Sequence, residues 1–157
     1  MNPAWSTAGL RDDPARPNQY DGAMRPIPLG AKGIFKLRVT PAHLANQFKD
    51  AMLPPVFATP MMIMAMENAA LNAIRAYLDP GESAVGTAVD VRHLAATPAG
   101  HEVTAEAEVT RVDGRRVEFD VKARDEKEEI GRGTHERMVI DMRRLDQRLS
   151  GKSKAKA

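Results

Sequence analysis

Residues 60–78 form a strongly apolar stretch, and this stretch limits most strongly how the chain can fold. Polar side chains interrupt it at Glu67, Asn68, Asn72 and Arg75. A membrane-spanning helix tolerates such groups poorly, whereas a helix packed inside a protein can turn them toward water or toward a site. The stretch therefore predicts one long core helix and no membrane segment.

The ends of this predicted helix carry recognisable signals. Thr59 is a typical N-cap residue, and Pro60 suits the first helical position, where a missing backbone N–H costs nothing. Pro80 and Gly81 break the pattern at the other end. We expect the helix to run from Pro60 to about residue 78.

Strand-like segments lie on both sides of the helix. Residues 33–40 alternate apolar and polar side chains, and four later segments do the same: residues 83–93, 102–111, 115–124 and 132–142. This order predicts an α+β fold in which a long central helix is wrapped by a curved antiparallel sheet of about five strands.

One domain is expected from a chain of 157 residues. We assign it to residues 31–145. Residues 1–30 are rich in proline and lack a periodic apolar pattern, which predicts a mobile N-terminal arm. Residues 146–157 read as a basic C-terminal tail.

The turn near Gly114 sets the register of one hairpin. A two-residue loop would pair Val109 with Glu118 and mix the two faces of the sheet. A three-residue loop of residues 112–114, with glycine in the left-handed position, pairs Val109 with Val117 instead. We predict the three-residue loop.

Composition excludes several classes of function. The chain has no cysteine, which removes thiolate nucleophiles and disulfides and fits a cytoplasmic protein. The net charge of +2 owes much to lysines in the tail, so a nucleic-acid partner is not expected. Metal-ligand spacings, phosphate-binding glycine loops and the GxSxG motif are also absent from the sequence. No metal or organic cofactor is expected.

Glu67 is the first candidate for a catalytic group. On a helical wheel it does not join the polar stripe of the helix but falls among apolar residues, namely Ile63, Ala70, Leu71, Ile74 and Leu78. An unpaired carboxylate there is costly to bury, which is acceptable at a site that uses its charge. The alternative is a structural glutamate that reaches a basic or backbone partner.

His93 and Thr59 are the other two candidates. Alternation places His93 on the same strand face as Val89 and Val91, where it is either a core histidine or a proton carrier. Thr59 is first of all a helix cap, but the N–H groups of that same first turn can also stabilise an oxyanion.

Several motifs resemble one family. The segments are VFATP (56–60), MEN (66–68), VGTAVDVRHLAATPAG (85–100), VDGRR (112–116) and GTHER (133–137). Together they resemble the fluoroacetyl-CoA-thioesterase-like branch of the hotdog proteins, over about residues 33–141.

This resemblance implies a homodimer that hydrolyses an acyl-CoA at a site formed by Thr59, Glu67 and His93. It also implies that Gly86 offers a backbone N–H to the substrate and that Arg137 lies close by. Phenylalanine side chains precede the threonine in the fluoroacetyl-specific member, whereas Asp50 and Leu53 stand in that approach here, so its choice of substrate does not transfer.

The implied reaction is hydrolysis of a small acyl thioester to a carboxylate and CoA. Glu67 acts either as general base on water or as the nucleophile, His93 relays the proton, and Thr59 stabilises the oxyanion. Two alternatives stay open: a hotdog hydratase or dehydratase, and a non-catalytic module that binds acyl-CoA.

Overall fold

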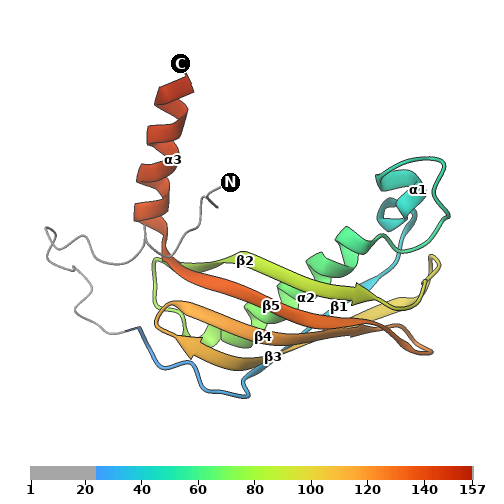
Figure 1. Ribbon diagram of the computed structural model, residues 1–157, viewed down its shortest axis with the longest axis horizontal. Helices are drawn as coiled ribbons and strands as arrows, with labels where there is room; N and C mark the ends of the chain where they lie inside the picture. The colour runs from blue at the N-terminus through green and yellow to red at the C-terminus, as the bar shows by residue number, and fades with distance from the viewer. Residues whose placement is uncertain (1–23, 157) are drawn as a thin grey trace, which may run out of the picture.

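A computed structural model of the protein describes residues 24–156 and shows a five-stranded sheet curved around one long helix (Figure 1). The helix α2 spans Thr59–Ile74, and the strands are β1 (Lys32–Arg38), β2 (Glu82–His93), β3 (Glu102–Asp113), β4 (Arg116–Arg124) and β5 (Glu129–Asp141). All pairs are antiparallel, in the order β1-β3-β4-β5-β2. The predicted α+β architecture is confirmed, and β2 lies at one edge of the sheet.

The core lies between α2 and the concave face of the sheet. Buried residues recur along α2 at intervals of three and four, as a helix with one apolar side requires: Met62, Ala65, Met66, Ala69, Ala70, Ala73 and Ile74. Four of these are alanines, which let the helix approach the strands closely. At Gly33 in β1 the approach is so close that a Cβ atom would overlap the backbone of Ala69 and Ala73.

The start of α2 differs from the prediction by one residue. Ala58 is the N-cap, Thr59 is already helical, and the Thr59 hydroxyl contacts His93 Nδ1. The assignment of Thr59 as the N-cap is therefore wrong, because the helix already includes this residue. The α-helix ends at Ile74 and continues as a 3-10 turn, Arg75–Tyr77.

Strand β2 contains a bulge that changes which side chains face the helix. Gly86 pairs with Arg137 and Ala88 with Glu136, so Thr87 is the extra residue. The Thr87 hydroxyl donates a 2.8 Å hydrogen bond to Glu136 Oε1. Simple alternation does not hold along the whole of β2, because the bulge shifts the phase. As a result Gly86 and His93 both face α2.

The hairpin between β3 and β4 also differs from the prediction. Val109 lies opposite Phe119 rather than Val117, and the turn consists of Gly114 and Arg115, with Gly114 at a φ of 59°. A bulge just after Val109 restores the alternation. The predicted three-residue loop is therefore wrong. The displacement is two residues, which keeps the same side chains on the core face.

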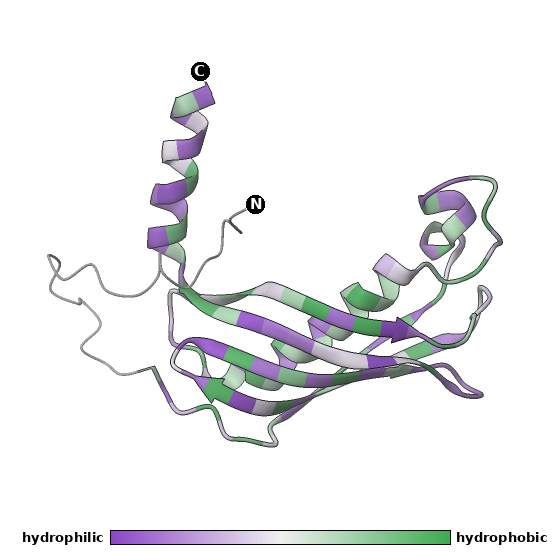
Figure 2. Ribbon diagram, in the orientation of Figure 1, coloured by the Kyte–Doolittle hydropathy of each residue, from purple (hydrophilic) through white to green (hydrophobic). Residues whose placement is uncertain are grey.

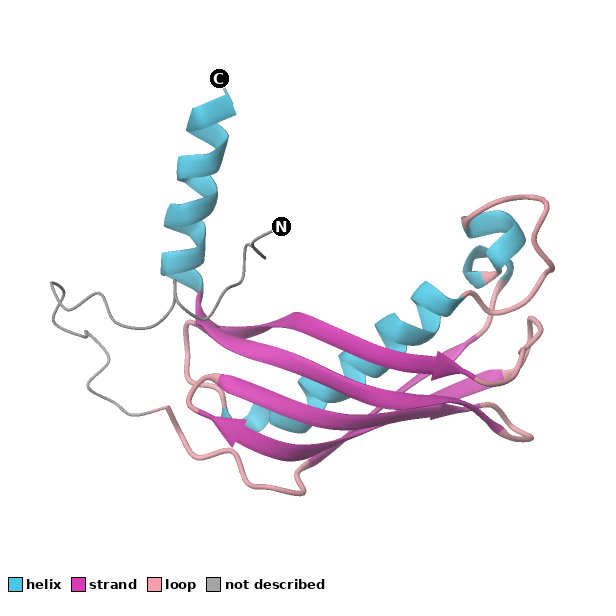
Figure 3. Cartoon of the chain, in the orientation of Figure 1, coloured by secondary structure: helices cyan, strands magenta, loops and turns pink. Residues whose placement is uncertain are grey.

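The remaining segments lie at the two ends of the sheet. The short elements η2 (Pro41–His43) and α1 (Ala45–Phe48) precede α2, and the exposed helix α3 (Met142–Lys156) extends away from the sheet after β5 (Figure 3). Hydrophilic residues dominate α3 (Figure 2). Residues 146–156 of the predicted basic tail belong to this helix.

The predicted N-terminal arm is described only from residue 24. Residues 1–23 lie outside the described part of the chain. Within the described part, Ile27 is buried, and Arg25 forms a 2.9 Å ion pair with Asp79. Among residues 24–156, no helix is long and apolar enough to cross a membrane.

Candidate active site

Thr59 and His93 form a direct contact between the helix and the sheet. The Thr59 hydroxyl lies 2.8 Å from His93 Nδ1, which joins the first residue of α2 to the last residue of β2. The contact puts a hydroxyl and an imidazole beside the N-terminal turn of a helix, where backbone N–H groups and the helix dipole favour negative charge. Two of the predicted site residues are therefore brought together.

The protonation of His93 follows from its surroundings. Burial lowers the pKa of His93 below the ordinary value of 6.5, and hydrogen bonding with the Ala95 backbone offsets this only in part. A neutral imidazole near pH 7 has one donor and one acceptor nitrogen. It can therefore exchange a hydrogen bond with Thr59 and still accept or release a proton.

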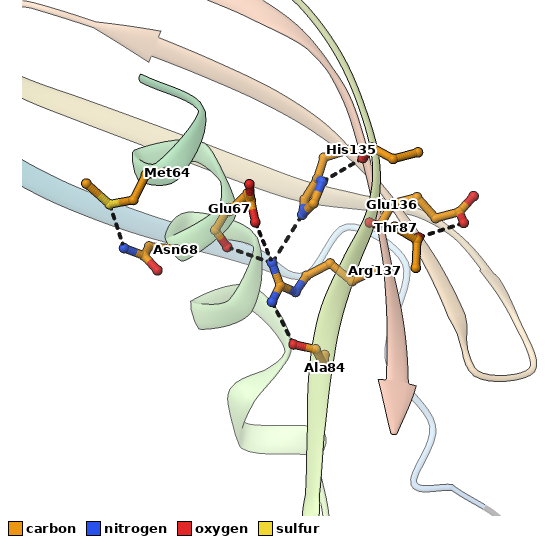
Figure 4. A network of polar contacts seen from close by, with 9 residues as sticks. Met64, Glu67, Asn68, Ala84, Thr87, His135, Glu136 and Arg137 are labelled. Carbon is orange, nitrogen blue, oxygen red and sulfur yellow. Dashed lines mark hydrogen bonds and ion pairs between the residues drawn. The ribbon is translucent and has the colours of Figure 1, made fainter. Parts of the chain in front are cut away.

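A second group of polar residues surrounds Arg137 (Figure 4). Arg137 Nη1 lies 3.7 Å from Glu67 Oε2 and 3.4 Å from the Glu67 carbonyl oxygen, and Nη2 donates a 2.6 Å hydrogen bond to the Ala84 carbonyl. These contacts connect α2, β2 and β5. Burial is the larger influence on the pKa of Arg137 and lowers it, while the charge of Glu67 raises it.

The surroundings of Glu67 differ from the prediction. Its side chain is 38% exposed, whereas that of Arg137 is only 9% exposed. The expectation of an unpaired carboxylate in apolar surroundings is wrong, because β2 and β5 bring a guanidinium to that side of the helix and leave the carboxylate open to solvent. Glu67 is therefore oriented by Arg137 and accessible to a ligand.

Gly86 lies directly against this carboxylate. A Cβ atom at Gly86 would be 3.1 Å from Glu67 Oε2 and 3.3 Å from His135 Cε1. Contacts that short would crowd a side chain at this position. The absence of a Cβ atom at Gly86 therefore leaves room beside the Glu67 carboxylate. The bulge at Thr87 turns this position toward Glu67.

His135 is a member of the group that the sequence analysis did not single out. It is 3% exposed, and its ring stacks on Phe119 with a centroid distance of 5.9 Å. Nδ1 lies 2.8 Å from the Ala88 carbonyl, and Nε2 lies 3.2 Å from Arg137 Nη1. The signal in the sequence was the GTHER segment, because alternation along a strand places residues 135 and 137 on one face.

The two groups are separate within one chain. Thr59 and Glu67 are about two turns apart on α2, or roughly 12 Å along the helix axis. Among the described residues, Glu67 and His93 share no hydrogen bond or ion pair. Glu67, Gly86 and Arg137 thus lie together, and Thr59 and His93 lie together some distance away.

The described residues contain no group of three or more histidine, aspartate or glutamate side chains arranged to hold a metal ion.

Sequence and structure comparisons identify the relatives of this chain. Residues 39–143 match the model of the family described as fluoroacetyl-CoA-specific thioesterase. The chain is 47% identical over 117 residues to the fluoroacetyl-CoA thioesterase of Streptantibioticus cattleyicolor, an overlap that covers 74% of this chain and 84% of the relative.

Solved structures agree with this assignment. The fluoroacetyl-CoA thioesterase FlK superposes with a TM-score of 0.77 and 39% identity, covering 81% of this chain and 98% of FlK. FlK has also been solved as a threonine-to-alanine variant in complex with fluoroacetate and as a threonine-to-serine variant in complex with acetyl-CoA. A thioesterase superfamily member from Thermus thermophilus superposes with a TM-score of 0.77 and 32% identity, covering 84% of this chain and 99% of that protein.

The sheet curved around one helix, shared with these structures, is the hotdog fold. The chain belongs to the fluoroacetyl-CoA-specific thioesterase family of hotdog proteins, a family of acyl-thioester hydrolases.

Proposed function

We propose that the protein hydrolyses small acyl-CoA thioesters with Thr59, Glu67 and His93. The observation that carries the proposal is the 2.8 Å contact between the Thr59 hydroxyl and His93 Nδ1 at the first turn of α2. A hydroxyl and an imidazole at the positive end of a helix dipole suit a tetrahedral oxyanion and its leaving group. Glu67 is a partly exposed carboxylate fixed by Arg137, which suits it to act on water or on the carbonyl carbon.

In the proposed reaction Glu67, Thr59 and His93 each have a separate task. Water adds to the thioester carbonyl carbon while Glu67 accepts its proton, and the oxyanion that forms is stabilised by the Thr59 hydroxyl and by the positive end of the dipole of α2. The carbon–sulfur bond then breaks. His93 relays the proton to the CoA sulfur, so that the products are a carboxylic acid and a free thiol. Direct attack by Glu67 through an anhydride leads to the same products.

The complete site requires a second subunit in this proposal. One carbonyl group cannot contact both Thr59 and Glu67 of the same chain across roughly 12 Å. Strand β2 lies at the edge of the sheet, and Val89 on it is 40% exposed although it faces the helix side. Pairing of β2 with β2 of a second copy would cover this apolar surface. It would also supply hydrogen-bond partners for the backbone groups at the exposed edge of the sheet.

Such a dimer would bring Glu67 of one subunit close to the Thr59–His93 pair of the other. Antiparallel pairing about a two-fold axis beside Val89 and Asp90 places Gly86 of one subunit opposite the partner's His93. Glu67, which lies against Gly86, then approaches the Thr59–His93 pair of the partner subunit. Each dimer would hold two such composite sites. In this arrangement Gly86 presents its backbone N–H to the substrate, and Arg137 supports Glu67.

Substrate choice is proposed from the approach to Thr59. The relative FlK acts on fluoroacetyl-CoA. Leu53 and Asp50 precede Thr59 here, and they offer no aromatic surface to the acyl group. We therefore expect turnover of several short acyl groups without selectivity for the fluorinated one. A cytoplasmic location is part of the same proposal.

A thiol-release assay tests the proposal. Purified protein is incubated with acetyl-, propionyl-, butyryl-, fluoroacetyl- and crotonyl-CoA in the presence of a thiol-detecting reagent, with Glu67→Gln as the control. Thiol release by the wild type, lost in the variant, supports hydrolysis. Loss of the crotonyl double bond without thiol release would indicate a hydratase, and acyl-CoA binding without turnover would indicate a binding module.

A further inference from the structure

His135 carries an arrangement of hydrogen bonds that the reaction described above does not use. We propose that His135 is a positioning residue that fixes the Arg137 guanidinium, and through it the carboxylate of Glu67. The proposal rests on the proposed function, because it assigns His135 a task in that same site. His135 touches neither the substrate nor the reacting atoms in this account.

The hydrogen bonds of His135 define its tautomer. Nδ1 lies 2.8 Å from the carbonyl oxygen of Ala88, which can only accept a hydrogen bond, so Nδ1 carries the proton. Nε2 lies 3.2 Å from Arg137 Nη1, which can only donate. Each ring nitrogen therefore has one defined role. The two contacts together require a neutral ring protonated at Nδ1.

Arg137 is held through both of its terminal nitrogens. Its Nη2 group donates to the Ala84 carbonyl, whereas Nη1 is shared between His135 Nε2 and the carboxylate and carbonyl oxygens of Glu67. The Ala84 contact alone leaves the guanidinium free to rotate about that bond. The acceptor on His135 supplies a second fixed point on the opposite side, so that Nη1 is directed toward Glu67.

The His135 ring is itself held in place by residues of β4 and β2. The ring is buried and stacked on Phe119 of β4, and its Nδ1–H bond to Ala88 ties β5 to β2 beside the bulge. A positioning group must itself be fixed, since small displacements of a catalytic carboxylate lower the rate steeply. Packing and hydrogen bonding both fix this ring.

Burial and the charge of Arg137 favour the neutral state of His135. Burial lowers the pKa of His135 most strongly; the charge of Arg137 lowers it further, while the Ala88 hydrogen bond and the carboxylates of Glu67 and Glu136 raise it. A proton on Nε2 would remove the acceptor and place a second positive charge against Arg137. Acid should therefore release Arg137 from His135.

Two substitutions separate this role from a merely structural one. In His135→Gln, the side-chain oxygen reaches the place of Nε2 and can still accept from Arg137. In His135→Asn, the amide nitrogen takes the place of Nδ1 and can still donate to Ala88, but nothing accepts from Arg137. The Gln variant thus keeps the hydrogen bond with Arg137, and the Asn variant keeps the hydrogen bond with Ala88.

We expect His135→Asn to lower kcat about 10-fold or more with little change in KM, and His135→Gln to restore most of the loss. Thermal melting of both variants establishes that they are folded. Equal kcat values for the two folded variants and the wild type would overturn the proposal, as would a larger loss in the Gln variant than in the Asn variant.

Nitrogen-15 NMR of the wild-type imidazoles gives a second test that needs no substrate. We expect the His135 ring to be protonated at Nδ1 alone near pH 7, and to shift on substitution of Arg137 by Lys or Gln. A ring protonated at Nε2 would overturn the proposal even if the Asn variant fails to fold. Absence of thiol release by the wild type would instead reject the proposed function, so the two failures are distinguishable.

Discussion

The hydroxyl of Thr59 lies 2.8 Å from Nδ1 of His93, so the first residue of the central helix is bonded to the last residue of the edge strand. Ala58, and not Thr59, is the N-cap of this helix. The Thr59 hydroxyl therefore bonds to the imidazole of His93 and does not cap the helix. Substitution of Thr59 should affect the site more than the stability of the helix.

Replacement of Thr59 by valine should affect activity far more than stability. Valine keeps the shape but loses the hydroxyl, so we expect thiol release to fall about 10²-fold. Loss of a true capping bond would lower the free energy of unfolding by about 1 kcal/mol, and that loss is not expected here. Thr59→Ser is the matched control and should retain most of the activity. A destabilised but fully active valine variant would contradict the assignment.

Replacement of Glu67 by glutamine should abolish most of the turnover while the fold remains. We expect kcat to fall by about 10² or more, because the amide can neither accept the proton of water nor attack the carbonyl. The ion pair with Arg137 is partly exposed, so the free energy of unfolding should change by less than about 1 kcal/mol. Thiol release and thermal melting of the same preparation measure both effects. Normal turnover per folded molecule would remove Glu67 from the mechanism.

Stability should fall as pH drops below about 6.5. Burial depresses the pKa of both His93 and His135 in the folded protein, so the unfolded chain binds more protons in this range. The folded state is therefore most stable above the ordinary histidine value of 6.5 and loses stability as pH falls from there toward the depressed values. Melting temperatures across this range test the sign. His93→Gln should show a shallower decline, and a decline as steep as in the wild type would contradict the contribution of His93.

Replacement of Gly33 by alanine should destabilise the fold. The added Cβ would overlap the backbone of Ala69 and Ala73 on α2, which cannot move without separating helix and sheet. We expect a loss of about 1–3 kcal/mol in the free energy of unfolding, measured by urea titration. Gly151→Ala on the exposed helix α3 is the control, because its Cβ would meet nothing within 4 Å. Equal stabilities for the two variants would mean that α2 lies farther from β1.

Replacement of Val89 by aspartate should separate the proposed dimer. Val89 is 40% exposed in the single chain, so the protomer should tolerate the charge, whereas an interface along β2 should not. Light scattering should report a dimer for the wild type and a monomer for the variant. Thiol release should fall in parallel, since each site is proposed to need both subunits. A wild-type monomer that hydrolyses acyl-CoA would refute the composite site.

Much of the fold was determined locally, by the sequence itself. The apolar period of α2 and the alternation in the strands depend on neighbours a few positions away, so the long helix, the five strands and their order of appearance were predicted correctly. The faces of β3 and β4 were also predicted correctly, because a register error of two residues leaves alternation unchanged.

Tertiary structure decided the features that depend on residues distant in the sequence. The bulge at Thr87 inverts the alternation of β2 and turns Gly86 toward Glu67. Pairing of β5 with β2 also brings Arg137 and His135 to the same carboxylate. Thr59 is already inside the helix and is not its cap, and its hydroxyl contacts His93, far along the chain. A local pattern indicates which face a side chain prefers, but only the packing of helix against sheet determines which partner it finds there.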